Sequence, residues 1–422
     1  MRRRLLMTLL FTLLWSAVVI VVVLAEAFWF TRPAARRGDA RAIERHLVRK
    51  LGAAAEDRRL GSAALVLLQG GEVVAEHGFG VANAETQSRV MPERTLYQVA
   101  SVSKLVTAWG VMKLVQDGRL GLDEPVLRYL KRWRFPGSPA FREKVTVRHL
   151  LSHTAGLDDG FGYGGFLPGE AIPTLEESLT LTRDSTVGQP RAVTVSREPG
   201  TAMAYSGGGY TVLQLLVEEV TGQRFADYMK EAVLQPLGMT NADFDLDRIE
   251  AEGRAQDLAT AFDHEVMPRP RRRHVAVASV GLYATARDLA RLAQAFRGNR
   301  VLSDDMLRQM MLPQQGTSGT WGLGTTLFVP NDAGGHVAGH DGGSPPAWGA
   351  MLRANPATGN AMVLTISGGR GAANQLGHDW VQWETGKLTA EGRRQIAFSR
   401  LPWAAAAIVL GALVFLLLYR PR

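Results

Sequence analysis

The sequence predicts an α+β fold: one antiparallel sheet built from both ends of the chain, with flanking helices and an inserted helical lobe. Strand-like apolar runs occur at residues 63–83 and return at residues 321–367. Between them, helical periodicity alternates with loops marked by glycine and proline, and this order favours a single sheet around a helical middle. The expected boundaries are residues 45–100 and 320–390 for the sheet lobe, 101–319 for the helical lobe and 32–400 for the whole domain.

Each expected element follows from a local pattern. Residues 34–60 are rich in alanine, arginine and glutamate at helical spacing, which predicts an amphipathic helix that docks on a membrane or stands off from it. Two apolar runs flank Gly70-Gly71, which is typical of a β-hairpin. Further helices are expected at residues 147–153, 210–222, 224–233, 286–298, 303–312 and 372–388. Further strands are expected at residues 321–330, 347–356 and 360–367.

The composition is that of a folded chain without a nucleic-acid signature. Of its 422 residues, 46% are hydrophobic and 21% are charged, which excludes wholesale disorder. The net charge is +8, but its dense run, residues 269–273, contains a proline and is typical of a solvated loop. The chain has no cysteine, so disulfides, thiolate metal sites and a cysteine nucleophile are excluded. We expect no nucleic-acid partner.

Both ends of the chain carry apolar segments long enough to cross a membrane. Residues 5–30 and 401–419 are almost free of charge, and about 20 apolar residues suffice for a spanning helix. We expect an N-terminal anchor within residues 1–31 and a C-terminal transmembrane helix and tail within residues 401–422. A cleaved signal peptide is the alternative for the first segment, but its apolar run exceeds the roughly 7 to 15 residues of a signal peptide.

The stretch YQVASVSKLV places Ser101 three residues before Lys104, where a strand-like run becomes a helix. Residues at this spacing share a helix face, so the amine can lie beside the hydroxyl and deprotonate it. The free N–H groups of a helix start suit a developing oxyanion, and desolvation would lower the pKa of the amine. A serine and a lysine at this spacing occur about once by chance in a chain of this length. A helix cap followed by a solvent-reaching lysine is therefore the alternative.

Two further motifs strengthen the catalytic interpretation. PGTAMAYSGGGY presents Tyr205 before a glycine loop that opens a helix, and GHDGGSP presents His340 before a strand. In this order, with GRLGLDEPVLRYL, VTVRHLLSHTAGL, GLYATARDLARLA and WGLG, they resemble the serine β-lactamase and penicillin-binding protein superfamily. The resemblance is to its class C-like branch of D-Ala-D-Ala peptidases, esterases and β-lactamase homologues, and covers about residues 45–385. It implies a serine β-lactamase/transpeptidase-like fold.

The resemblance implies a role for each matching residue. Ser101 would be acylated, Lys104 would help to deprotonate it, and Tyr205 would relay protons as a second acid or base. Gly342 would give the substrate close access to the backbone. The oxyanion would lie between the N–H groups of Ser101 and Gly343.

Two positions depart from the family pattern. Gly207 stands where the second motif usually has an asparagine, whose amide in the family helps to hold the counterpart of Lys104 and contacts the amide side chain of the substrate. Gly207 weakens the expectation that this substrate site recognises amides. His340 stands in place of the lysine of the third motif. A neutral imidazole supplies less positive field than an ammonium, so we expect activity that is more sensitive to pH near neutrality.

Two histidine pairs and one glycine-rich segment give weaker indications of a functional site. His149 with His153, and His336 with His340, have the spacing of zinc-binding helices. The first pair lacks the glutamate of a zincin, and the second lies in a glycine-rich segment. We expect the first pair to be hydrogen-bonded and to brace the helical lobe. GFGYGG at residues 160–165 follows no strand, which favours a flexible loop beside the site over a nucleotide site. No metal and no cofactor are expected.

These features predict a membrane-anchored serine hydrolase that acts through an acyl-enzyme on an amide, ester or β-lactam carbonyl. The family activities are those of D-Ala-D-Ala peptidases, esterases and β-lactamases. The alternative is a membrane-tethered binding or sensor protein of the same fold that turns over slowly or not at all. The expected partners are a small-molecule or peptidoglycan-type peptide substrate and membrane lipid.

The orientation in the membrane rests on two opposing signals. More arginines follow the first apolar segment than the three that precede it, which favours a cytoplasmic domain. That rule weakens for long translocated domains, and the predicted chemistry favours the outer side. We expect a periplasmic or extracellular domain at the bacterial inner or plasma membrane.

Overall fold

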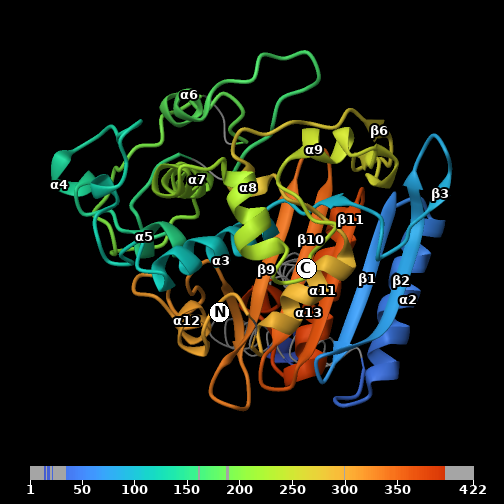
Figure 1. Ribbon diagram of the computed structural model, residues 1–422. Helices are drawn as coiled ribbons and strands as arrows, with labels where there is room; N and C mark the ends of the chain where they lie inside the picture. The colour runs from blue at the N-terminus through green and yellow to red at the C-terminus, as the bar shows by residue number, and fades with distance from the viewer. Residues whose placement is uncertain are drawn as a thin grey trace, which may run out of the picture.

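A strand-rich half and a helical lobe lie side by side in the molecule (Figure 1). The computed structural model describes residues 14–15, 17–19, 21, 35–159, 162–186, 190–298 and 300–394. The helical lobe contacts the strand-rich half through α3 (Val102–Gln116), which packs against β9 (His336–Ser344). This contact positions the predicted nucleophile.

The central sheet has seven strands in the order β3-β2-β1-β11-β10-β9-β8. The remaining bounds are β1 (Ser62–Gln69), β2 (Glu72–Asn83), β3 (Ser88–Arg89), β8 (Thr326–Pro330), β10 (Trp348–Asn355) and β11 (Asn360–Ser367). The strand β1 pairs antiparallel with β11, with Leu65 opposite Leu364. The prediction of one antiparallel sheet from both chain ends is therefore confirmed. The hairpin at Gly70-Gly71 is also confirmed, as the turn between β1 and β2.

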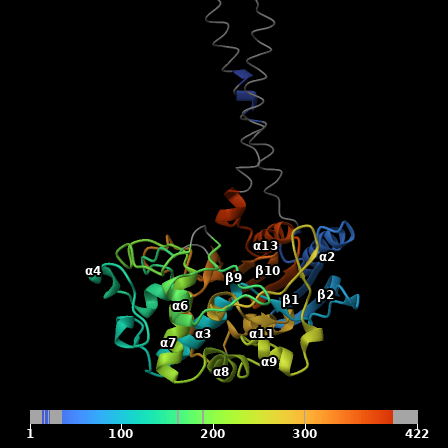
Figure 2. The same cartoon turned by 90° about the horizontal axis from the view of Figure 1, so that it is seen from above.

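Helices cover both faces of the sheet (Figure 2). They are α2 (Ala40–Glu56) and α13 (Arg370–Thr385) on one face and α11 (Ala286–Ala295) on the other. Leu65 packs in one core with Leu47 of α2, and Val66 packs in the opposite core with Leu289 of α11. Because both faces are covered, β1 is an unbroken apolar run instead of an alternating one.

Two helices have partners that the sequence did not indicate. The helix expected over residues 34–60 is α2, and its apolar side, with Ile43, Leu47 and Leu51, packs against the sheet. The apolar side of this helix therefore docks on the sheet and not, as expected, on a membrane. The helix α11 falls within residues 101–319, but it also packs on the sheet.

The helical lobe is organised around α3, most of whose residues are buried. The other elements between the two parts of the sheet are β4 (Tyr97–Gln98), η1 (Val126–Arg128), α4 (Pro139–Arg142), α5 (Val147–Leu151), α6 (Leu175–Thr180), α7 (Gly207–Thr221), α8 (Phe225–Met229), η2 (Lys230–Leu234), α9 (Leu246–Ala251), η3 (Ala255–Asp257), β5 (Ala261–Phe262), β6 (Pro268–Arg269), α10 (Val277–Val280), β7 (Tyr283–Ala284) and α12 (Asp304–Met310). The pairing of β4 with β7 ties the segment before α3 to the segment after α10. The six helices expected from periodicity are confirmed as α5, α7, α8, α11, α12 and α13.

The segments expected to cross a membrane, residues 5–30 and 401–419, lie almost entirely outside the described residues. Among the helices of the described ranges, none has both the length and the apolar character of a membrane span. The two ends of the described domain contact each other. Trp383 Nε1 donates to the Arg36 carbonyl at 3.0 Å, and Arg37 Nε donates to the Glu384 carbonyl at 3.2 Å.

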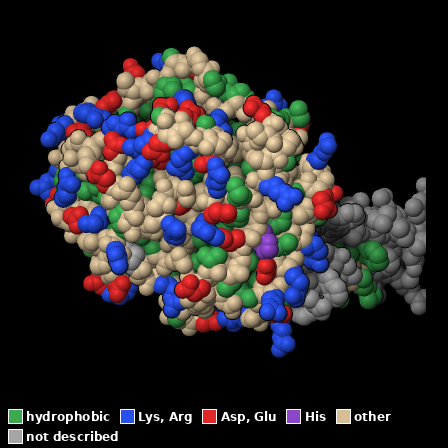
Figure 3. Space-filling model, turned by 45° about the vertical axis from the view of Figure 1, so that its right-hand side comes forward, with side chains coloured by type: hydrophobic (Ala, Val, Ile, Leu, Met, Phe, Trp, Pro, Cys, Tyr) green, Lys and Arg blue, Asp and Glu red, His purple; other side chains and the backbone are tan. Residues whose placement is uncertain are grey.

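Charged side chains of both signs are interspersed over the face shown in Figure 3. Within the arginine-rich run, Arg269 pairs with Asp263 at 2.6 Å and Arg273 pairs with Glu250 at 2.9 Å. Two of the four arginines of this run therefore have acidic partners, and Arg271 and Arg272 donate to backbone carbonyls.

Candidate active site

Ser101 lies at the N-terminus of α3, directly after a strained turn. Its neighbour Ala100 has φ of 47°, in the left-handed region that non-glycine residues rarely adopt. This turn allows the chain to leave β4 and begin α3 with Ser101 as the N-cap residue. The predicted nucleophile thus stands where a helix begins.

Lys104 brings its amine to that hydroxyl from inside the lobe. Nζ lies 3.2 Å from Ser101 Oγ and donates a second hydrogen bond to the Ser279 carbonyl at 2.9 Å. Burial lowers the pKa of the Lys104 amine to about 7, although the negative charge of Asp159 opposes the shift. A large fraction of the amine is therefore neutral at neutral pH and able to accept the proton of Ser101.

The phenol of Tyr205 reaches the same hydroxyl from the loop before α7. Burial raises the pKa of the Tyr205 phenol above its ordinary value, and a hydrogen bond with Ser101 opposes that shift. The Lys104 amine lies 5.1 Å from the centre of the Tyr205 ring. The structure therefore brings the three side chains together, with a protonated phenol beside a partly neutral amine.

His340 faces this group from β9, with its ring centre 6.4 Å from that of Tyr205. Its Nδ1 lies 2.6 Å from the Asp341 carbonyl and must be the donor, because a carbonyl oxygen only accepts. Burial and the charge of Lys104 lower the pKa of the His340 imidazole to about 3. His340 is therefore neutral near neutrality. The pH sensitivity expected from His340 stays a prediction, and the group near it with a pKa of about 7 is the Lys104 amine.

The glycines of the third motif let β9 pass close to the nucleophile. A Cβ atom at Gly342 would lie 2.3 Å from the Val99 carbonyl oxygen and 3.1 Å from the Ser101 nitrogen, so a side chain there would push β9 away. Pairing of β9 with β8 ends at Gly339. The part of β9 that follows Gly339 therefore has no strand partner on the β8 side. The assignment of the Ser101 and Gly343 N–H groups to an oxyanion hole stays a prediction.

A neighbouring aromatic ring fills the space beside Gly207. A Cβ atom at this first residue of α7 would lie 2.9 Å from Tyr163 Cε2. Tyr163 is fixed there because its hydroxyl accepts a hydrogen bond from Thr211 Oγ1 at 2.9 Å. Tyr163 belongs to the glycine-rich segment expected to form a loop beside the site, and the described part of that segment does lie there.

Two motif residues support the site in ways that the sequence did not reveal. The His153 ring lies 4.2 Å from the Tyr205 ring, and its Nδ1 accepts from the Ser206 N–H at 3.1 Å. The Trp321 ring lies 5.8 Å from the Tyr205 ring and 5.2 Å from the His340 ring. His153 belongs to the motif VTVRHLLSHTAGL and Trp321 to the motif WGLG, but only the fold places them around Tyr205.

The expected bond between His149 and His153 is wrong. His149 Nδ1 accepts from the Thr146 N–H at 3.3 Å, within the cap of α5. Each imidazole thus satisfies a different backbone group. The reason is the tight turn after α5, where His153 has φ of 59° and its ring is turned toward α7.

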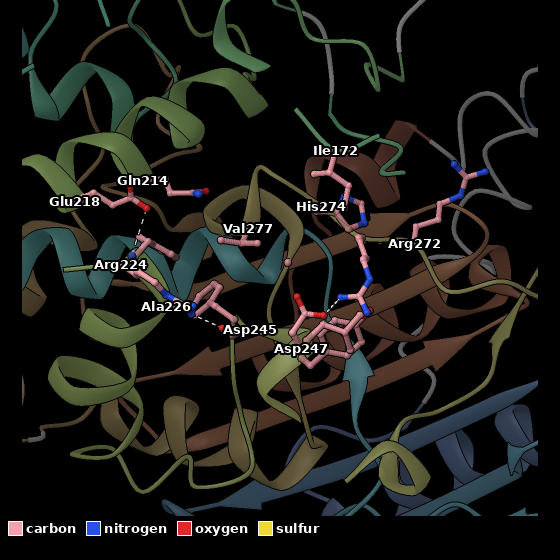
Figure 4. Close-up of a pocket in the computed structure, with 16 residues that line it drawn as sticks. Ile172, Gln214, Glu218, Arg224, Ala226, Asp245, Asp247, Arg272, His274 and Val277 are labelled. Carbon is pink, nitrogen blue, oxygen red and sulfur yellow. Dashed lines mark hydrogen bonds and ion pairs between the residues drawn. The ribbon is translucent and has the colours of Figure 1, made fainter. Parts of the chain in front are cut away.

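A separate surface cavity of ≈ 320 Å³ lies between α7, α8, α9 and the segment that contains α10 (Figure 4). It is lined by none of the four predicted catalytic residues. Arg224 pairs with Asp245, and Arg273 pairs with Asp247, among its lining residues. Its charges are thus largely satisfied by one another.

Comparisons with known proteins agree with this arrangement. The family profile described as "Beta-lactamase" matches residues 41–387. The chain belongs to the beta-lactamase family. "Esterase EstB" of Burkholderia gladioli is 29% identical over 329 residues, covering 71% of this chain and 83% of that protein.

A second relative and a solved structure are also similar to this beta-lactamase family protein. "Penicillin-binding protein 4*" of Bacillus subtilis (strain 168) is 31% identical over 172 residues, covering 40% of this chain and 35% of that protein. The solved structure of the octameric penicillin-binding protein homologue from Pyrococcus abyssi has a TM-score of 0.66 at 25% identity, covering 86% of this chain and 82% of that one. The resemblance seen in the motifs is confirmed, and the protein is a serine hydrolase of this family. The roles of the individual site residues stay predictions.

Proposed function

We propose that this beta-lactamase family protein hydrolyses carboxylic esters through an acyl-enzyme on Ser101. The observation that carries the proposal is the position of the Lys104 amine, 3.2 Å from the serine hydroxyl. Burial lowers the pKa of that amine to about 7, so it is a usable base at neutral pH. A serine hydroxyl needs such a base before it attacks a carbonyl.

The proposed reaction has two steps. The neutral Lys104 amine takes the hydroxyl proton while Ser101 Oγ attacks the ester carbonyl carbon, and the oxyanion is stabilised by the N–H groups of Ser101 and Gly343. Tyr205 donates its proton to the departing alcohol and regains one from Lys104. A water molecule then attacks the acyl carbonyl carbon and passes its proton through Tyr205 to the neutral Lys104 amine. As the bond to Ser101 Oγ breaks, that proton returns to Oγ, which releases the acid and free Ser101.

Gly207 and Tyr163 favour an ester over an amide. Position 207 offers no side-chain amide to the substrate, and the Tyr163 ring lies in the space where one would begin. A site without a hydrogen-bonding partner for a polar group of the substrate does not select strongly for substrates that carry this group. One relative, 83% of which is covered by the match, is named as an esterase.

The test combines labelling with turnover. A fluorophosphonate probe should label the wild type and not Ser101→Ala, and p-nitrophenyl butyrate should be hydrolysed faster than a D-Ala-D-Ala peptide or a chromogenic cephalosporin. Labelling of the wild type without turnover of any substrate would instead favour the binding or sensor protein. Equal labelling of Ser101→Ala would refute the proposal.

We also propose that residues 5–30 and 401–419 anchor this domain to one membrane, with the domain on the outer side. The hydrogen bonds that join Arg36 to Trp383 and Arg37 to Glu384 hold the two ends of the domain together. Two spans that left from these ends would enter the membrane side by side. Carbonate-resistant membrane association, with protease access from outside the cell, is expected. Recovery in the carbonate wash would contradict the anchoring.

A further inference from the structure

A buried carboxylate stands beside the position from which the family asparagine is missing. Asp159 is 5% exposed. Its Oδ1 accepts from Ser206 Oγ at 2.5 Å, and its Oδ2 accepts from the Gly208 N–H at 2.6 Å. Ser206 and Gly208 flank Gly207. The carboxylate is therefore held by the Ser206 hydroxyl on one side of the gap and by the Gly208 N–H on the other.

Asp159 has no close ion-pair partner among the described residues. A buried charge without compensation is strongly unfavourable. Burial raises the pKa of the Asp159 carboxyl, and the hydrogen bonds from Ser206 and Gly208, followed by the charge of Lys104, oppose that shift and favour the ionised form. Lys104 is the cation whose charge acts on this carboxyl.

The other titratable groups near that amine supply no negative charge. They are His153, His340 and the phenols of Tyr205 and Tyr210. Burial lowers the pKa of both imidazoles and raises the pKa of both phenols, so all four groups are neutral near neutrality. Asp159 is the source of the negative field at Lys104.

We propose that Asp159 is a positioning residue for Lys104 and takes over, through its charge, the support that the family asparagine provides at position 207. Tyr163 fills the volume that the missing side chain leaves. This inference rests on the proposed function of Lys104 as the base. In this arrangement the base is supported by a segment that precedes α7, at Asp159 and Tyr163, instead of by the first turn of α7.

The expected consequence concerns the pH at which the base becomes active. The negative charge of Asp159 raises the pKa of Lys104, against the larger effect of burial. Without that charge, the amine would lose its proton at a lower pH. The acid limb of the acylation rate would therefore move to lower pH, which a general loss of packing would not produce.

The experiment measures the rate of fluorophosphonate labelling from pH 5 to 9 in the wild type and in Asp159→Asn. We expect the midpoint of the acid limb to fall by about one pH unit, the effect of one nearby charge. Asp184→Asn is the matched control, because Asp184 also accepts from this loop, at the Gly165 N–H, and the charge change is the same. Its midpoint should equal that of the wild type. An unshifted midpoint in Asp159→Asn would overturn the inference.

A second measurement does not depend on activity. The free energies of urea unfolding of the wild type, Lys104→Met, Asp159→Asn and the double variant form a double-mutant cycle, which measures the coupling between the two charged groups. We expect the double variant to be more stable than the sum of the single effects predicts, because neither charge is then left alone. Strict additivity would overturn the inference even if Ser101 is labelled. Absence of labelling in the wild type, with coupling intact, would instead count against the proposed function alone.

A rescue variant covers the case in which Asp159→Asn does not fold. Tyr163→Ala opens the space beside Gly207, and Gly207→Asn then restores the family side chain. Adding both to Asp159→Asn should restore folding and labelling. Failure of this triple variant to fold, beside a folded Tyr163→Ala/Gly207→Asn control, would overturn the inference.

Discussion

The two halves of the candidate site, α3 and the segment that enters α7, differ in how closely they follow the family pattern. On α3, Ser101 and Lys104 keep the spacing of the family, and one helical turn sets their distance of 3.2 Å. On the α7 side, Tyr205 is kept, but Gly207 has replaced the asparagine, and residues of a loop surround the gap. The reacting groups depend on one rigid helix, whereas their electrostatic support can come from a different segment.

The largest effect is expected from a substitution in the α3 half of the site. Ser101→Ala should lower kcat/KM for p-nitrophenyl butyrate by at least about 10⁴-fold, because the nucleophile is removed. Ser103→Ala is the control from the same stretch, since Ser103 Oγ accepts a structural hydrogen bond from the Leu282 N–H. It should keep the label at some loss of stability. Loss of the label in Ser103→Ala alone would transfer the nucleophile to Ser103.

Lys104→Met should lower the acylation rate by about 10³ to 10⁴-fold, the upper range for loss of a general base. The protein should remain folded, because a buried amine is replaced by an apolar side chain. Burial lowers the pKa of Lys104 in the native state to about 7, so the unfolded chain binds more protons above that pH. Wild-type stability should therefore rise between about pH 7 and 10. Urea unfolding should show this slope in the wild type and a smaller one in Lys104→Met; equal slopes would contradict the buried neutral amine.

Tyr205→Phe tests the half that enters α7. The ring and its contact with His153 remain, but the proton of the phenol is lost, so kcat should fall by about 10² to 10³-fold. Stopped-flow measurement of alcohol release and acid release would show which step slows. Unchanged rates of both steps would remove Tyr205 from the reaction.

Gly342→Ala tests the close approach of β9 to α3. The added Cβ atom would meet the Val99 carbonyl oxygen at 2.3 Å, so β9 must shift away from Ser101. A displacement of this size should lower kcat/KM by on the order of 10²-fold. The variant should still fold by circular dichroism. Full activity would show that the substrate does not use this part of β9.

The smallest effect is expected for His340→Gln. The wild-type imidazole is neutral because burial lowers the pKa of His340 to about 3. The rate should therefore fall by less than about tenfold, below the range of a general acid or base, with no shift of the midpoint between pH 5 and 9. A shifted midpoint would show that His340 carries charge in the working enzyme, and an unchanged rate at every pH would remove it from the site.

The comparison of the two halves also explains what the sequence could predict. The sheet and its helices follow from local periodicity, and the spacing of Ser101 and Lys104 on one helix determines their approach. Asp159 and Tyr163 lie more than 40 residues from Gly207 in sequence, and no local pattern relates a loop carboxylate to a distant helix start. The structure places His340 of β9 near Tyr205 and Trp321, but the neutral state of its imidazole depends on burial, which sequence spacing does not report.

The acylation rate of Ser101 from pH 5 to 9 tests the account most directly. A neutral fluorophosphonate should label the wild type with a rate that rises through a single midpoint near pH 7, where the buried Lys104 amine loses its proton, and Lys104→Met should show no such rise. A flat wild-type profile, or the same midpoint in Lys104→Met, would contradict the assignment of Lys104 as the base.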